Sequence, residues 1–245
     1  WGLDTNILYD EPKRVRDDIV PFPYYLYQPS FFNNLLFLLD PYQIKHYAKM
    51  LVNNFTGKYN DFTDLRSLNS WEHLFIFSEE RVWQAYNGVR QGKMVAMQNT
   101  NEKLAIDDLS NLPTENIDNN IVDLVKNNPD VHFIIYLPPY SILRFVELYQ
   151  DDRQKLEAEW KLKDYLISRL LNFKNVSIFD FQTVKEITHN LNNYKDLTHY
   201  SGVVDAYILT DLSANRHQLK SGEEYNSSNQ LRAQVEDFIF SGLKK

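Results

Sequence analysis

The residues best suited to chemistry are an aspartate and a histidine three positions apart. Asp196 and His199 stand in the run Asp-Leu-Thr-His-Tyr at 196–200. At this spacing one tight helical turn brings the carboxylate to the imidazole Nδ1, which fixes the ring tautomer and leaves Nε2 free to take a proton. The pattern therefore predicts the acid–base half of a catalytic triad, with Asp196 orienting the ring of His199.

A nucleophile to match this pair is not evident in the 245 residues. Triad serines on strand-to-helix elbows need small neighbours, because the backbone there makes a strained turn. Ser141 follows an apolar run through Pro138-Pro139, but its neighbours Tyr140 and Ile142 are bulky. Two interpretations of Ser141 stay open: an elbow nucleophile, or a residue that lines a pocket or caps the helix beginning at Ile142.

Two other interpretations of the aspartate and histidine also stay open. In the simpler one, His199 caps a turn and Asp196 is an acidic residue at the start of the next helix. In the other, Asp180 and His189 join the pair as ligands of a metal hydrolase, although no helical His-x-x-x-His spacing supports such a site. Our prediction for the chain includes no metal and no other cofactor.

Composition excludes several classes of protein. A formal net charge of -7 and the lack of a basic stripe argue against nucleic acid as a partner. Cysteine is absent, which rules out a disulfide framework and a thiolate nucleophile. No apolar run approaches the roughly 20 residues that cross a bilayer. The chain begins at Trp1 instead of Met, and we expect its natural N-terminus to lie upstream.

Hydrophobic patterns indicate an α/β protein. Continuous apolar runs at 131–137 and 176–181 are typical of buried strands, and the helical periodicity of 140–173 between them predicts a right-handed parallel crossover. Other helices are expected at 31–39, 41–53, 79–86, 114–127, 202–212 and 229–240. The segment 57–108 has no clear period, and we expect an irregular or helical insertion over about 20–110 in a single domain spanning 1–245.

The number of strands is too small for the length. Trp1 to Leu3 is a third strand candidate, whereas a doubly wound sheet usually has about four to six strands. We therefore expect the first strands, and the nucleophile with them, to precede the chain. An unpaired sheet edge would then bind that upstream segment or a second copy.

Three blocks carry a resemblance to a known family: 133–141, the strand ending in Asp-Phe-Gln at 180–182, and 193–201. Together they resemble the C-terminal half of bacterial SGNH-hydrolase-like proteins. The branch most similar is that of the envelope proteins related to teichoic-acid D-alanylation and alginate O-acetylation. The resemblance covers about 129–212, and it implies a three-layer α/β/α sandwich with a parallel, flavodoxin-like sheet that lacks its first strands here.

The resemblance also assigns roles to residues. Asp196 and His199 match the late Asp-x-x-His block that supplies the acid and base of the family's triad. The family's Gly-x-Ser nucleophile has no counterpart here. Asp4 stands where the family has an oxyanion-hole asparagine, and because a carboxylate cannot donate a hydrogen bond unless protonated, that role is not carried over.

The function implied is that of an SGNH-like esterase or O-acyltransferase acting on a cell-envelope polysaccharide or a related polyol ester. The implied location is outside the cytoplasmic membrane, held there only by an anchor upstream. The alternative is a non-catalytic envelope module that binds a glycan or a protein. Aromatic residues make up 14% of the chain, and their clusters at 22–27 and 71–77 could stack on sugar rings or pack a core.

Overall fold

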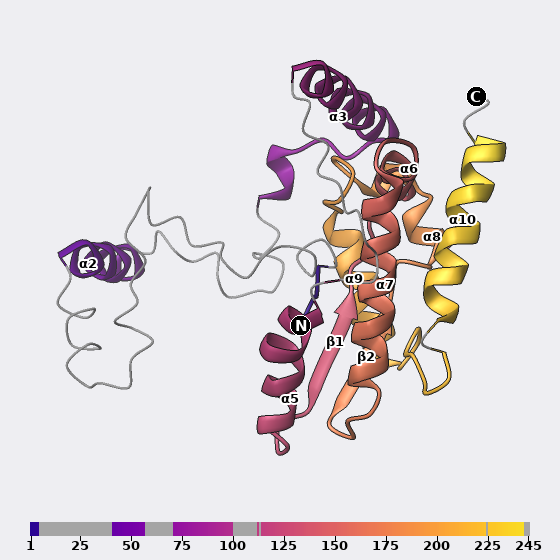
Figure 1. Ribbon diagram of the computed structural model, residues 1–245. Helices are drawn as coiled ribbons and strands as arrows, with labels where there is room; N and C mark the ends of the chain where they lie inside the picture. The colour runs from indigo at the N-terminus through magenta and orange to yellow at the C-terminus, as the bar shows by residue number, and fades with distance from the viewer. Residues whose placement is uncertain (5–40, 57–70, 100–111, 113, 224, 243–245) are drawn as a thin grey trace. The chain divides into compact units, whose positions relative to one another are not determined.

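Figure 1 shows the computed structural model of the protein, which describes residues 1–4, 41–56, 71–99, 112, 114–223 and 225–242. The chain divides into two compact units, Pro12–His73 and a larger one formed by Trp1–Glu11 with Leu74–Lys245. The smaller unit contains helix α2 (Pro41–Phe55), which was predicted. The helix expected at 31–39 and the aromatic cluster at 22–27 lie outside the described residues. Among the helices that are described, none is long and apolar enough to cross a membrane.

The larger unit contains a parallel pair of strands. Strand β1 (Phe133–Leu137) pairs with β2 (Val176–Asp180), in a register that sets Phe133 beside Val176 and Leu137 beside Asp180. Both strands lie where the apolar runs predicted them, and the parallel pairing confirms that the chain crosses over between them. The fold is therefore mixed α/β and mostly helical, with a small two-stranded parallel sheet.

Single bridges extend this sheet at both edges. Gly2 bridges Tyr136 in parallel, where the Leu3 N–H donates to the Tyr136 carbonyl at 2.9 Å and the Tyr136 N–H donates to Trp1 at 3.0 Å. A Cβ on Gly2 would lie 2.8 Å from the Tyr136 hydroxyl oxygen, so a larger residue at position 2 would displace the Tyr136 ring. On the other edge, Gln218 forms an antiparallel bridge with Phe179.

Helices supply most of the remaining described structure. Those before β1 are the 3₁₀ turn η5 (Glu72–Leu74), α3 (Glu79–Asn99), α4 (Thr114–Ile117), the π-helical turn η6 (Asp118–Val122) and α5 (Asp123–Asn127). Those after β1 are α6 (Ile142–Asp151), α7 (Arg153–Leu170), α8 (Lys185–Thr188), the 3₁₀ turn η7 (Leu191–Asn193), α9 (Gly202–Ser213) and α10 (Asn226–Gly242). The segment 57–108 is thus not irregular throughout, since α3 occupies 21 of its residues.

The helical stretch expected between the strands is two helices instead of one. It breaks at Asp152, whose backbone leaves the helical conformation and whose carboxylate accepts a hydrogen bond from the Lys155 N–H at 3.1 Å. An aspartate at this position caps the start of α7, because it satisfies one of the N–H groups that the first turn leaves without a partner. The periodicity of the apolar residues did not reveal this break.

The two faces of the sheet pack into different hydrophobic clusters. Neighbouring strand residues point to opposite faces, and Ile178 and Phe179 accordingly belong to separate clusters. The cluster of Ile178 also contains residues of α4, η6, α5 and much of α7, whereas the cluster of Phe179 contains residues of α3, α6, α9 and α10. Beyond their carboxyl ends, β1 and β2 both continue into loops.

Candidate functional site

The predicted aspartate and histidine lie on a closed loop between η7 and α9. Its ends are tied by an antiparallel bridge between Tyr194 and Tyr200 and by a hydrogen bond from the Ser201 N–H to the Asn193 carbonyl at 2.8 Å. Within it, the Lys195 N–H donates to the His199 carbonyl at 3.1 Å. These bonds restrict the loop to one shape in which Asp196 and His199 face each other.

Three contacts fix this loop at the carboxyl end of β1. The fully buried Tyr194 donates from its hydroxyl to the Pro139 carbonyl at 3.0 Å. The Leu197 carbonyl accepts two hydrogen bonds from Ser141, from its N–H at 3.1 Å and from its Oγ at 2.9 Å. The Ser78 N–H, just before α3, donates to the Tyr194 carbonyl at 3.1 Å. The carboxyl edge of a parallel sheet is where ligands of α/β proteins usually bind.

The carboxylate of Asp196 holds the imidazole of His199. Nδ1 of His199 lies 2.7 Å from Oδ2 of Asp196, while Oδ1 accepts hydrogen bonds from the N–H groups of Thr198 at 2.9 Å and His199 at 2.8 Å. The predicted contact is confirmed, although a turn makes it instead of a helix. Since α9 begins only at Gly202, the interpretation of Asp196 as the first acid of that helix is wrong.

The other ring nitrogen of His199 faces solvent. The side chain is 64% exposed, and Nε2 makes no hydrogen bond with any residue that the structure describes. With Nδ1 occupied by the carboxylate, the neutral ring carries its proton on Nδ1 and presents the Nε2 lone pair outward. This is the arrangement in which an imidazole can accept a proton from a hydroxyl group.

The surroundings of Asp196 favour its ionised form. Partial burial raises the pKa of the carboxyl group, but the hydrogen bonds from His199 and Thr198 outweigh burial and leave the pKa below its ordinary value of 3.8. The carboxylate is thus charged at neutral pH and able to orient the ring.

This lowered pKa predicts how stability depends on pH. Asp196 binds its proton more weakly in the folded state than in the unfolded chain. The stability that its carboxylate contributes is therefore complete when the pH lies above the ordinary pKa of 3.8, and it is lost as the pH falls through the lower pKa of the folded state. Urea denaturation of the wild type and Asp196→Asn should give a difference in unfolding free energy that is constant from about pH 7 to about pH 5 and shrinks below about pH 4. A difference that grows on acidification would contradict this sign.

A shallow pocket of about 350 Å³ lies beside the pair. Leu74, Phe75 and Ile76 form its apolar wall, and Arg81, Lys195 and Asp196 supply its charges. The Lys195 ammonium lies 3.6 Å from the centre of the Phe75 ring, which is a cation–π contact. Phe75, which belongs to the aromatic cluster at 71–77, thus lies on the wall of the pocket that Asp196 also lines.

Ser141 is an anchor of the loop in the structure. It is fully buried, it occupies the N-cap position of α6 without a side-chain capping bond, and its hydroxyl is used by Leu197. The predicted position at the start of the helix is confirmed, whereas the nucleophile interpretation finds no geometric support. The anchoring roles of Ser141 and Tyr194 were not predicted from the sequence. The only local signal was a small polar residue between a buried strand and the helix that begins at Ile142.

Removing the Ser141 hydroxyl should loosen the loop. In Ser141→Ala the Leu197 carbonyl keeps its bond to the backbone N–H, so we expect a loss of only about 1 kcal/mol of stability. Amide hydrogen exchange of Thr198 and His199 should quicken, because their N–H groups bond to a carboxylate on the same loop. Ser213→Ala, an exposed serine bonded within its own helix, is the matched control. Unchanged exchange in Ser141→Ala would show that the hydroxyl does not hold the loop.

Asp4 follows the segment that bridges β1. It accepts a hydrogen bond from the Tyr140 hydroxyl, and burial together with this bond raises the pKa of Tyr140 far above its ordinary range. Asp4 is therefore an acceptor here, as expected of a carboxylate, and not an oxyanion donor.

The four residues of the metal alternative are not brought together. Asp180 is bound to Lys163 and Ser227, and His189 packs its ring against Phe238, with its pKa lowered by burial. No group of three or more histidine or carboxylate side chains in the described part of the chain could hold a metal ion.

The arrangement is that of a mixed α/β protein with an oriented Asp–His pair at the carboxyl edge of a parallel sheet. No family model, curated protein or solved structure matches the chain.

Proposed function

We propose that this chain carries the acid–base half of an SGNH-like esterase or O-acyltransferase. The observation that carries the proposal is the 2.7 Å contact between Nδ1 of His199 and Asp196, with Nε2 left open to solvent. The bridging of Gly2 with β1, and the helices packed against either face of the strands, support a three-layer α/β/α arrangement for the larger unit.

The proposed reaction has two acyl-transfer steps. His199 Nε2 accepts the proton of a serine hydroxyl as the serine Oγ attacks the ester carbonyl carbon, and the same proton then passes to the leaving alkoxide. Water or a sugar or polyol hydroxyl next gives its proton to His199 Nε2 as its oxygen attacks the acyl carbon. The bond between that carbon and the serine Oγ then breaks, and His199 returns the proton to the serine oxygen, which regenerates the enzyme. Asp196 keeps the ring in one tautomer and stabilises the imidazolium in both steps.

The substrate proposed is an ester on a cell-envelope glycan or polyol, and the proposed site of action is outside the cytoplasmic membrane. Both come from the resemblance of the blocks at 133–141, 180–182 and 193–201. The apolar wall beside Asp196 suits the hydrocarbon part of such an ester.

The second candidate is a non-catalytic module that binds a glycan or a protein. One observation favours it: among the described residues, no serine side chain forms a hydrogen bond with His199. The two candidates differ in whether a serine becomes nucleophilic.

A fluorophosphonate probe distinguishes them, because it forms a covalent adduct only with an activated serine. The full natural protein is treated with the probe, and the labelled peptide is found by mass spectrometry. The esterase proposal expects one labelled serine in the wild type and none in His199→Ala. Absence of labelling in the wild type, with glycan binding retained, would establish the binding module instead.

A further inference from the structure

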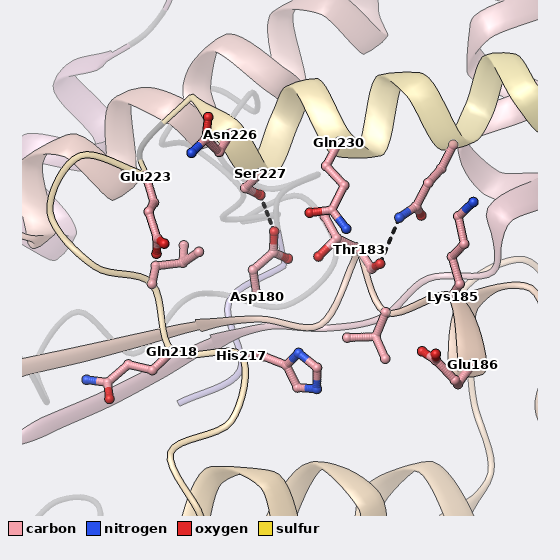
Figure 2. A pocket seen from close by; sticks show the side chains of 13 residues that line it. Asp180, Thr183, Lys185, Glu186, His217, Gln218, Glu223, Asn226, Ser227 and Gln230 are labelled. Carbon is pink, nitrogen blue, oxygen red and sulfur yellow. Dashed lines mark hydrogen bonds between the residues drawn. The ribbon is translucent and has the colours of Figure 1, made fainter.

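A second pocket, larger than the one beside Asp196, lies at the carboxyl end of β2. Its volume is about 570 Å³, and it is lined by residues of the loop from Asp180 to Glu186, of the bridged segment 217–219 with Glu223, and of the first turns of α10. Figure 2 shows Asp180 between Ser227 of α10 and His217 of the bridged segment. It shares no lining residue with the pocket of the Asp–His pair. We propose that this pocket binds a neutral, hydroxyl-rich ligand such as a sugar or polyol.

The lining of the pocket is rich in amide groups. Four amide side chains, Gln218, Asn226, Gln230 and Gln234, line the pocket. Amides present both donors and acceptors without charge, and hydroxyl groups both donate and accept. A ligand with several hydroxyl groups can satisfy such a surface, whereas an apolar ligand would leave it without partners.

The lining also contains a buried hydrogen-bond acceptor, the Oε1 atom of Gln234. Gln234 is 4% exposed, and its Nε2 donates to the Thr183 carbonyl at 2.8 Å, which fixes the orientation of the amide. Its Oε1 is buried and has no hydrogen-bond partner among the residues that the structure describes. A buried acceptor without a donor is costly, so this oxygen calls for a ligand that donates a hydrogen bond.

The floor of the pocket is held in place by bonds within the protein. Asp180 is bound by Lys163 at 2.8 Å, by the Gln182 N–H at 2.9 Å and by the Ser227 hydroxyl. Behind the pocket, His217 Nε2 lies 3.0 Å from Asp211, and the His217 ring stacks on Tyr207. Because these groups are held by the protein, little ordering is needed when a ligand enters.

Charge selects among the ligands that could donate hydrogen bonds. Asp180 is neutralised by Lys163, and the remaining charged groups of the lining are Lys185, Glu186 and Glu223. The excess of carboxylates disfavours phosphate and carboxylate ligands. Lys185 offsets one of the two glutamates, so little net charge remains to attract a polyamine, and a neutral polyol meets no repulsion.

The proposal is tested by adding each probe to the full chain and monitoring the amide signals by ¹H–¹⁵N NMR. Glucose, N-acetylglucosamine and ribitol are the neutral probes, and inorganic phosphate and spermidine are the charged ones. We expect saturable shifts for at least one neutral probe, confined to 180–186, 217–219 and 226–234. No saturation with any neutral probe, or saturation of these residues only with phosphate or spermidine, would overturn the proposal.

Two variants make the test specific. Gln230→Ala removes an exposed lining amide without disturbing the core, and Gln234→Met removes the buried acceptor while keeping the side-chain volume. Each should weaken binding of the neutral probe about tenfold or more. Gln154→Ala, on the exposed surface of α7, is the control and should bind as the wild type does. Equal affinity in Gln230→Ala and the wild type would place the ligand elsewhere and overturn the assignment.

Discussion

Replacing His199 with alanine should lower the turnover of an ester substrate by about 10²–10⁴-fold, because the variant loses the group that accepts and returns the serine proton. The fold should remain intact, since the side chain is 64% exposed and bonds chiefly to Asp196 on its own loop. The measurement is hydrolysis of an activated ester by the full natural protein, with circular dichroism to follow the fold.

The control for this experiment is His132→Ala. His132 is also exposed, and it bonds at 3.1 Å to Ser177, which lies near the amino end of β2 and away from the carboxyl edge. Turnover in this variant should equal that of the wild type. Wild-type turnover in His199→Ala would remove the catalytic role of the pair and leave the binding module as the better account.

Asp196→Asn separates the orienting role from the loop geometry. The asparagine Oδ1 can still accept from the N–H groups of Thr198 and His199, so the loop keeps its shape. Its amide donates to Nδ1, however, and the ring must then carry its proton on Nε2, the wrong tautomer for a base. Turnover should fall in this variant as well, with loop amide shifts close to those of the wild type.

Replacing Lys163 with methionine should lower the free energy of unfolding by about 3–5 kcal/mol. The Lys163 ammonium and the Asp180 carboxylate are 1% and 2% exposed and lie 2.8 Å apart. Without the ammonium, a buried carboxylate keeps only the hydrogen bonds of Gln182 and Ser227, which do not offset its lost hydration. Urea denaturation measures the loss.

Two further variants test the cause of this loss. Lys161→Met lies on the exposed surface of the same helix and should change stability by no more than about 0.5 kcal/mol. The double variant Lys163→Met/Asp180→Asn removes both charges and should recover much of the stability, because no uncompensated ion remains buried. If the double variant were less stable than Lys163→Met alone, the buried charge would not be the cause.

Elements and contacts formed by residues that are close in the sequence could be predicted from the sequence alone. Apolar runs predicted the strands at 133–137 and 176–180, and the helical spacing of apolar residues predicted most of the helices. The contact between Asp196 and His199 spans only three positions, so the spacing alone brings the two side chains within reach. The break at Asp152 was missed because the apolar pattern continues across it.

Features that join distant segments depended on the folded chain. Ser141 holds Leu197 across 56 positions, and Ser227 bonds Asp180 across 47. The amide-lined pocket likewise combines residues from Asp180 to Gln234. No local propensity encodes such partners, because packing of the helices against the sheet decides which side chains meet. The chemistry of the pair could therefore be predicted from spacing, whereas its anchoring and the second pocket follow only from tertiary packing.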